Sequence, residues 1–195
     1  EEITQRPFED YMAENILLPL NMHHSAFKWN SYVSENISGF YDEHNESVLN
    51  FREPIQANGG LYSTLSDLLN FQQSWMLDWD EDFIHPAVLS EASIIKMHSR
   101  WVPTEGFYKF FSDAYGLGHF IDYTDKGKKV VFHPGQGAGA VTLVLGIPEE
   151  GIGIVILTNS ARSWQFVAAV LDQWLKFHHV SWNGMNCLFI NLKIA

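Results

Sequence analysis

The chain has 195 residues, of which 46% are hydrophobic, which is enough apolar material for an ordered globular domain. Its formal net charge of −11 at pH 7 disfavours nucleic acids and anionic membrane surfaces as partners, because no basic cluster offsets the acidic excess. A single cysteine excludes an intramolecular disulfide, and we expect no membrane span because no apolar segment is long enough.

The first part of the chain shows helical patterns separated by long irregular connections. Pro7 suits a first helical turn and Pro19 ends the segment, so one helix is predicted between them. A second helix is predicted to begin near Thr64, where Thr64 to Asp67 can act as a capping arrangement. A third, shorter helix is predicted over Ser90 to His98. The apolar stripes of the first two helices consist of Phe8, Tyr11, Met12 and Ile16, and of Leu65, Leu68, Leu69, Gln72, Trp75 and Met76.

The second part of the chain has the apolar runs and turn residues of antiparallel strands. Val141 to Ile147 and Ile152 to Leu157 flank Pro148 to Gly151, in which proline presets a turn and glycine accepts a positive φ. Leu117 to Tyr123 and Lys129 to His133 flank a second cluster of turn residues. These runs predict two β-hairpins. A helix is predicted to cover the resulting sheet with the stripe Phe166, Val167, Val170, Leu171, Trp174 and Leu175.

These patterns divide the chain into three parts. Residues 1–112 form a helical and irregular part, and residues 113–179 form antiparallel strands with a covering helix. Residues 180–195 form a tail for which an extra strand, an extension or sequence from an altered gene end all stay open. The Gly59-Gly60 pair before the second helix indicates either an unusual φ or a tight approach of the backbone.

Five short blocks follow one another over roughly residues 7 to 175. They are Phe8-Glu9-Asp10-Tyr11-Met12 with Ile16 to Met22, Gly59 to Thr64 with Asp67-Leu68, Tyr115-Gly116-Leu117-Gly118, His133-Pro134-Gly135 with Gly139, and Leu157-Thr158-Asn159. In this order they resemble the beta-lactamase-related serine hydrolases, the family of class C beta-lactamases, D-alanyl-D-alanine carboxypeptidases and esterases. The resemblance implies an α/β (α+β) fold with an antiparallel sheet flanked by helices and a helical subdomain. It also implies that the first helix and first strands of that fold precede this segment.

The chemistry of this family needs three elements. A serine in Ser-x-x-Lys at a helix start loses its proton to the lysine one turn away, and a Tyr-x-Asn element helps that transfer. A Lys- or His-Thr-Gly strand closes the site. Only the third element is visible, as His133-Pro134-Gly135, and the resemblance implies that the other two lie upstream of Glu1. The implied substrate is a small-molecule or peptide-like acyl compound.

The resemblance assigns roles to three residues around this motif. His133 takes the position usually held by lysine, where it would donate to a substrate carboxylate or join the proton relay. The alternative is an ordinary histidine that ends a strand. Gly135 would let the substrate lie against the backbone, and the backbone N–H of Gln136 would supply half of the oxyanion hole.

Pro134 departs from the family pattern, which usually has Thr or Ser there to help hold the substrate carboxylate. Proline offers neither a hydroxyl nor an N–H, and it is tolerated on a strand that lies at a sheet edge. This substitution disfavours penicillin-like substrates and favours esters, amides or a protein that binds without catalysis.

Two segments have the spacing Ser-x-x-Lys, and the serine of each is a candidate nucleophile. Ser25 with Lys28 lies in a connection after a helix-stopping proline, where the rigid geometry of an activated serine is not expected. Ser93 with Lys96 is better placed, within a predicted helix, but it falls on the wrong side of the Gly-Gly block for this family. The competing interpretation of Ser93 is a solvated helix surface.

No motif indicates a metal or a cofactor, and we expect neither. The adjacent pairs His23-His24 and His178-His179 are interpreted as surface residues, because neighbouring side chains point in different directions. The resemblance makes a secreted or periplasmic location an expectation, although any signal region would lie outside this sequence.

Three interpretations stay open: the substrate-side half of a serine hydrolase, a non-catalytic beta-lactamase-like binding protein, and a truncated product without an independent role. The resemblance implies that the strand Ile152 to Thr158 pairs with a neighbour that precedes this sequence. An apolar strand left unpaired recruits another chain, so we expect the 195 residues alone to fold poorly or to self-associate through this edge.

Overall fold

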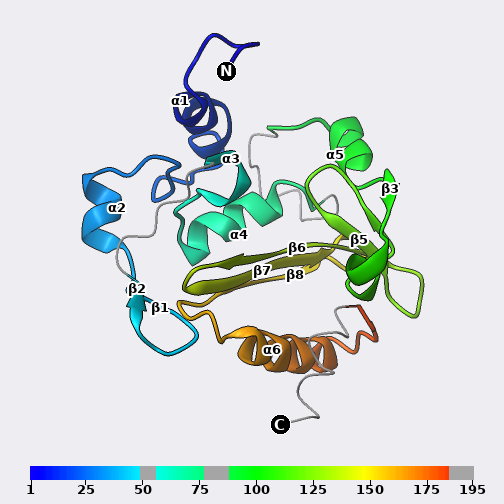
Figure 1. The fold of residues 1–195 in the computed structure, drawn as a ribbon. Coiled ribbons are helices and arrows are strands. Elements are labelled where there is room, and N and C mark those ends of the chain that lie inside the picture. The colour runs from blue at the N-terminus through cyan, green and yellow to red at the C-terminus, as the bar shows by residue number, and fades with distance from the viewer. Residues whose placement is uncertain (49–55, 77–87, 185–195) are drawn as a thin grey trace.

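A six-stranded antiparallel sheet forms the centre of the protein, in a computed structural model that describes residues 1–48, 56–76 and 88–184. Its strands lie in the order in which they follow in the chain, and helices cover both faces (Figure 1). The strands are β3 (Val102–Pro103), β4 (Ala114–Tyr115), β5 (Phe120–Tyr123), β6 (Lys129–Gly137), β7 (Ala140–Ile147) and β8 (Ile152–Leu157). This arrangement confirms the antiparallel sheet flanked by helices.

The helical elements of the structure come mostly from its first half. They are α1 (Phe8–Met12), a π-helix (Ala13–Leu17), α2 (Ser31–Asn36), α3 (Gln56–Gly59), α4 (Leu65–Gln73), α5 (Glu91–Met97), two 3₁₀ turns (Gly106–Phe110 and Pro148–Glu150) and α6 (Trp164–Phe177). A two-stranded hairpin, β1 (Phe40–Tyr41) with β2 (Ser47–Val48), stands apart from the main sheet. Among the described helices, none combines the length and apolar character needed to cross a membrane.

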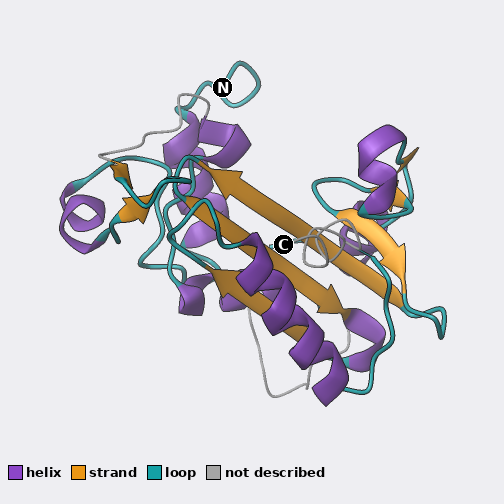
Figure 2. Ribbon diagram, turned by 60° about the horizontal axis from the view of Figure 1, so that its bottom comes forward, coloured by secondary structure: helices purple, strands orange, loops and turns teal. Residues whose placement is uncertain are grey.

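One face of the sheet is covered by α6, which runs lengthwise along the strands (Figure 2). Its apolar stripe buries Val167, Leu171 and Leu175 against the sheet, as the helical spacing predicts. The described start of the tail joins the same core. Trp182 is 8% exposed, its ring centroid lies 5.2 Å from that of Phe132, and its Nε1 donates to Asp122 Oδ2 at 2.9 Å.

The other face of the sheet is covered by α4, which approaches β7 and β8 very closely. A Cβ on Gly146 would lie 2.6 Å from Met76 Sδ and 2.9 Å from the Trp75 ring, and Gln72 donates from Nε2 to the Leu145 carbonyl. Gly60 is also a close approach, since a Cβ there would lie 2.7 Å from Gln56 Cα. The sequence left open whether the Gly59-Gly60 pair indicates an unusual φ or a tight approach of the backbone, and this contact at Gly60 favours the tight approach.

Both hairpins are confirmed, but three boundaries differ from the predictions. β5 begins at Phe120 instead of Leu117, because Gly118 has a φ of +88° and bends the chain before the strand. β6 continues four residues beyond His133, because β7 pairs with it as far as Gly137. The second helix ends at Gln73, so Trp75 and Met76 lie in the turn that follows it.

The sheet ends at β8 in the described part of the chain, where only β7 pairs with it. On its α4 side the strand is covered, since a Cβ on Gly153 would meet Gln72 at 2.5 Å. The edge of β8 that no described strand pairs with is the feature on which the self-association prediction depends. Self-association itself stays a prediction, as do the divisions at residues 112 and 179.

Candidate active site

The second half of β6 has a free backbone edge. β5 pairs with β6 over Lys129 to Phe132, whereas His133 to Gly137 pair only with β7 among the described residues. The strand is therefore internal at its start and an edge strand at its end. The candidate motif lies entirely in the open half.

Hydrogen bonds further along the sheet fix the direction of the backbone groups in this half. The N–H of Thr158 donates to the carbonyl of Val141 at 3.0 Å, so the backbone groups of Val141 face away from β6. Gln136 lies opposite Val141, and antiparallel pairs alternate between hydrogen-bonded and non-hydrogen-bonded. The pair is thus non-hydrogen-bonded, and the N–H of Gln136 points to the free edge.

Pro134 has the same orientation as Gln136, two residues along the strand. Its nitrogen faces the free edge, so the missing donor removes no ladder bond to β7. β6 is not an edge strand in the order of the sheet, but it is one at the proline. This explains why a proline is accommodated inside a nine-residue strand.

His133 lies where the free edge begins, beside two aromatic rings. Its ring centroid is 5.6 Å from that of Phe120 and 6.1 Å from that of Tyr115. Although the residue is exposed overall, partial burial against these rings lowers the pKa of its imidazole, and a hydrogen bond with the Pro134 backbone opposes that shift. The imidazole is therefore neutral at pH 7, unlike the lysine that the family usually has.

Gly135 has a structural reason to be glycine as well as the predicted one. Its partner across the ladder is Thr142, and a Cβ on Gly135 would collide with Thr142 Oγ1. A side chain at this position would therefore require the Thr142 hydroxyl to move.

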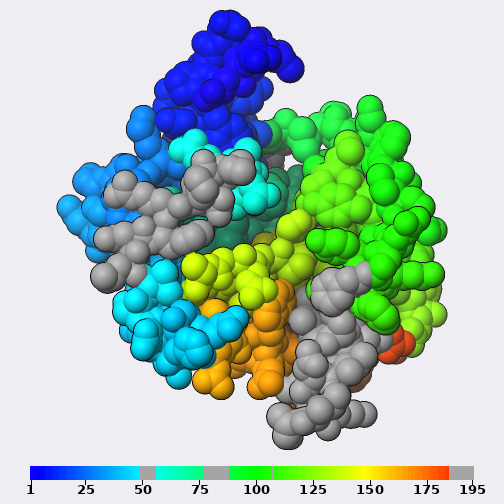
Figure 3. All heavy atoms as spheres, viewed as in Figure 1, coloured from blue at the N-terminus to red at the C-terminus, as the bar shows by residue number. Residues whose placement is uncertain are grey.

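An open depression of about 340 Å³ adjoins the end of β6. It is lined by Asp42, Glu43, His44, Gln136, Gly137, Ala138 and Ala161. In Figure 3 the cyan segment that carries the first three residues lies beside the yellow-green end of β6. Backbone N–H groups of Glu46 and His44 bond the Asp42 carboxylate and lower its pKa, so the wall facing the motif is acidic.

The β1–β2 hairpin, which no sequence pattern predicted, is held in place by the block Leu157-Thr158-Asn159. Tyr41 donates its N–H to the Asn159 carbonyl at 3.0 Å, and the Asn159 side chain donates to the Gly39 carbonyl at 2.8 Å. Gly139 allows the contact, since a Cβ there would lie 2.7 Å from Phe40 Cβ. These residues therefore position the acidic wall.

Neither Ser-x-x-Lys match forms a nucleophile and base pair. Ser93 lies exposed on α5, where its Oγ is 2.9 Å from Ser90 Oγ, while Lys96 Nζ lies 6.0 Å from the centre of the Trp101 ring. The structure thus supports the alternative interpretation of Ser93 as a helix-surface residue.

Ser25 has a structural role. Its Oγ donates to the buried Asp67 carboxylate at 2.7 Å and lies 2.7 Å from Ser63 Oγ, while Lys28 pairs with Glu9 at 3.5 Å. Asp67 also accepts the N–H of His24, so it ties this loop to the start of α4. The Ser25 hydroxyl therefore helps to hold this loop in place.

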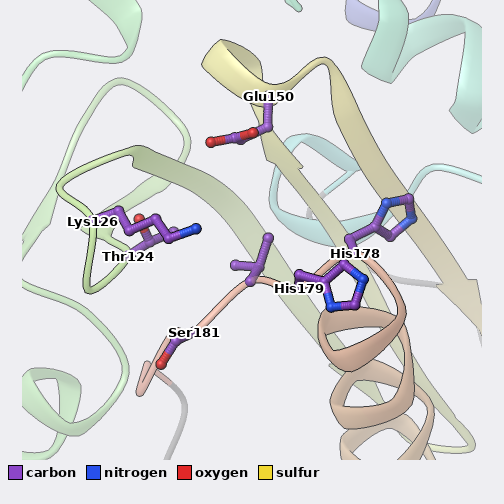
Figure 4. Close-up of a pocket in the computed structure, with 7 residues that line it drawn as sticks. Thr124, Lys126, Glu150, His178, His179 and Ser181 are labelled. Atoms are coloured by element: carbon purple, nitrogen blue, oxygen red, sulfur yellow. The ribbon is translucent and has the colours of Figure 1, made fainter.

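A second, smaller pocket lies at the end of the sheet where β6 begins, away from the motif. Its volume is about 80 Å³, and Figure 4 shows His178 and His179 at the end of α6, with Lys126 on the β5–β6 turn and Glu150 on the β7–β8 turn. His179 is exposed and His178 is half-buried. In residues 1–48, 56–76 and 88–184, no three His, Cys, Asp or Glu side chains gather closely enough to hold a metal ion.

Comparisons with known proteins agree with this fold. The sequence profile of the family described as Beta-lactamase matches residues 1–175. Protein flp of Staphylococcus aureus (strain NCTC 8325 / PS 47) is 23% identical over 159 residues, which is 82% of this chain and 30% of that protein.

Two solved structures are also similar. A penicillin binding protein from Bacillus halodurans superposes with a TM-score of 0.68 at 20% identity, over 88% of this chain and 51% of its own. A class C beta-lactamase superposes with a TM-score of 0.66 at 19% identity, over 82% and 48%. The chain thus spans about half the length of these structures.

Proposed function

Because this chain belongs to the beta-lactamase family, we propose that it supplies the substrate-binding strand of a serine hydrolase that cleaves an ester, amide or peptide bond through an acyl-enzyme. The observation that carries the proposal is the free edge of β6 from His133 to Gly137. An extended acyl substrate can add to such an edge as a further strand, held by backbone hydrogen bonds.

Within this site, Gln136 and His133 take different roles. The N–H of Gln136 points to the free edge, where it donates to the carbonyl oxygen that becomes negative during acyl transfer. The neutral imidazole of His133 donates one hydrogen bond or relays a proton, but it brings no fixed positive charge. Gly135 keeps the ladder to β7 intact beneath the substrate.

We further propose that the nucleophile and its base come from a Ser-x-x-Lys and a Tyr-x-Asn segment upstream of Glu1 in the full-length protein. Two observations support this. The Ser93 and Ser25 hydroxyls are engaged by Ser90 and Asp67, and the chain spans about half the length of the solved structures that it resembles.

The charges around the site favour substrates without a carboxylate at this end. His133 is neutral, Pro134 has no hydroxyl, and the Asp42 and Glu43 side of the depression is acidic. Among the described residues that line the depression, a substrate carboxylate would meet no lysine or arginine and would be repelled by the acidic side, whereas a neutral or cationic ester or amide would be accepted. Penicillin-like compounds carry such a carboxylate and are therefore disfavoured.

The second candidate is a beta-lactamase-like binding protein without catalysis, and Pro134 is the observation that favours it. The two candidates differ in one respect, because the binding protein has no Ser-x-x-Lys in its full-length chain.

A third interpretation, a truncated product, predicts self-association through the edge of β8. A monodisperse monomer that melts cooperatively would contradict the third one.

The experiment uses the full-length protein and p-nitrophenyl esters of neutral and of carboxylate-bearing acids. We expect hydrolysis of the neutral ester, and we expect His133→Ala to lower kcat/KM by about 100-fold, which is typical for loss of a proton-transfer group. His23→Ala, an exposed histidine outside the site, serves as the matched control. Activity that depends on neutral His133 should fall as the pH drops through its lowered pKa.

Two further measurements separate the candidates. Pro134→Thr restores a hydroxyl and should raise kcat/KM for the carboxylate-bearing ester by about 10-fold, the worth of one hydrogen bond to a charged group. A fluorophosphonate probe should label a serine upstream of Glu1 and leave Ser93 and Ser25 unmodified. A folded full-length protein with no hydrolysis and no labelled serine would refute the hydrolase and support the binding protein.

A further inference from the structure

Three aromatic side chains from different elements meet between the sheet and the helices α4 and α5. Trp75 lies in the turn after α4, His98 follows the end of α5, and His119 lies directly before β5. The three ring centroids are 5.2 to 5.3 Å from one another. Their exposed fractions are 1%, 3% and 6%, so the cluster is closed to solvent.

Each ring of this cluster carries a buried nitrogen that has no hydrogen-bond partner. The atoms are Trp75 Nε1, His98 Nε2 and His119 Nδ1. Leaving a buried polar group unpaired costs about 1 to 3 kcal/mol, so three such groups at one contact are unfavourable compared with an apolar cluster of the same size. Packing alone therefore does not explain why two histidines lie here.

We propose that Trp75, His98 and His119 form an acid-sensitive latch, which holds α4 and α5 on the sheet while both imidazoles are neutral and releases them when either is protonated. An apolar cluster of Trp75, Met76, Ile94, Ile121 and Val131 contributes to the same contact, but it carries no titratable group. The proposal concerns conformation and does not depend on the proposed function.

The groups around the pair strengthen the effect of protonation. Burial, and to a smaller extent the Lys129 ammonium, lowers the pKa of His98 to about 4. Burial, with smaller contributions from His98 and His133, lowers the pKa of His119 to about 3. A proton on either ring would thus face other cations. The remaining charged groups near these elements are exposed or paired elsewhere: Glu91 and Lys96 on α5, the Arg100–Asp113 ion pair, and Asp122, which accepts from Trp182.

The direction of the pH effect follows from these shifts. Both pKa values are lower in the folded protein than the ordinary histidine value of 6.5, so the unfolded chain takes up protons first. The stability is therefore complete above pH 6.5 and falls progressively as the pH drops towards 4 and then 3. Once a ring is protonated, the buried charge favours opening of the contact.

The latch lies next to the free edge of β6. Phe120 directly follows His119, and its ring lies 5.6 Å from that of His133. Opening at His119 would loosen the start of β5, which pairs Phe120 with Phe132 just before the free edge begins. Release is thus expected to change the environment of His133 before the whole sheet unfolds.

The test compares acid-dependent thermal melting of the wild-type full-length protein with that of the double variant His98→Phe/His119→Phe. Phenylalanine keeps an aromatic ring and cannot be protonated. We expect the wild-type Tm to fall between about pH 6.5 and pH 4.5, whereas the double variant should fall much less there, because it retains only the lowered pKa of His133, and should unfold about one pH unit lower. The matched control is His23→Phe, an exposed histidine whose replacement should leave the acid transition unchanged.

A second measurement decides the matter if the double variant does not fold. Imidazole ¹⁵N resonances of the wild-type chain should show His98 and His119 neutral at pH 5.5, and they should become protonated only together with loss of the near-ultraviolet circular dichroism of the tryptophans. Protonation of both rings near pH 6.5 with that signal intact would overturn the proposal, as would parallel melting curves for the wild type and the double variant.

Discussion

The two faces of the sheet are packed in different ways. On the α6 face, large apolar side chains fill the space between sheet and helix, and no buried polar nitrogen there is unpaired in the described residues. On the α4 face, the helix and the turn after it pack closely against glycines of the strands. All three buried nitrogens without a hydrogen-bond partner in the described residues lie on this face. The first face is an apolar core. The second combines close contact with groups that respond to protons.

The two faces should therefore tolerate different kinds of substitution. A core filled by side chains loses stability when a side chain is shortened, because a cavity is left. A contact made over glycine loses stability when a side chain is added, because the packed neighbouring side chains must then shift. Substitutions of opposite kinds should therefore be the most damaging on the two faces.

The largest effect is expected from Phe132→Ala on the α6 face. Phe132 is fully buried, and its ring lies 5.5 Å from that of Phe120 and 5.2 Å from that of Trp182. Truncation should lower the free energy of unfolding by about 4 kcal/mol, as measured by urea denaturation. Phe166→Ala is the control, because this α6 residue is 60% exposed and should change stability by less than about 0.5 kcal/mol. Equal effects of the two variants would mean that the α6 face is not the main core.

A smaller but substantial effect is expected from Gly146→Val on the α4 face. The new Cβ would lie 2.6 Å from Met76 Sδ and 2.9 Å from the Trp75 ring, so α4 must shift away from the sheet. We expect a loss of about 2 to 3 kcal/mol by urea denaturation. Gly137→Val is the matched control, because a Cβ on that strand glycine would meet no atom within 4 Å. If both variants are equally stable, the approach of α4 is looser than its glycines indicate.

The sequence predicted the α6 face well, because its signals are local. The turn at Gly151 has a φ of +65° and the turn at Gly127 a φ of +76°, as short turn motifs require. The stripe of α6 repeats at helical spacing and buries Val167, Leu171 and Leu175 as expected, but Phe166, which the stripe included, is 60% exposed. The exception is Trp182, whose partner Asp122 lies 60 residues earlier and leaves no local pattern.

The α4 face and the candidate site were predicted only in part. The His133-Pro134-Gly135 motif was found by resemblance, but its strand was expected to stop there, since proline and glycine usually interrupt strands. Pairing with β7 overrides that local preference. The β1–β2 hairpin was missed because two-residue strands give no alternating pattern, and the acidic wall was missed with it.

The histidine latch has no sequence signal at all. His98 and His119 lie in different elements, and neither stands at a spacing that indicates contact with the other or with Trp75. The apolar stripe placed Trp75 on the buried face of the second helix, but the turn after Gln73 decides where its ring points. Such a cluster is visible only when the tertiary contacts of three elements are known.

The smallest effect, and the only stabilising one, is expected at the end of α6. His179 has a φ of +55°, in the left-handed region where a side chain is strained, and its N–H donates to the Lys176 carbonyl as in a common helix C-terminus. His179→Gly should raise the free energy of unfolding by about 0.5 to 1 kcal/mol, because relief of strain exceeds the added entropy of the unfolded chain. His178→Gly is the control: its φ is −88° and its ring lies 4.8 Å from that of Trp174, so glycine there should destabilise. A loss of stability in both variants would mean that the side chain of His179 contributes more to the small polar pocket than its backbone strain costs.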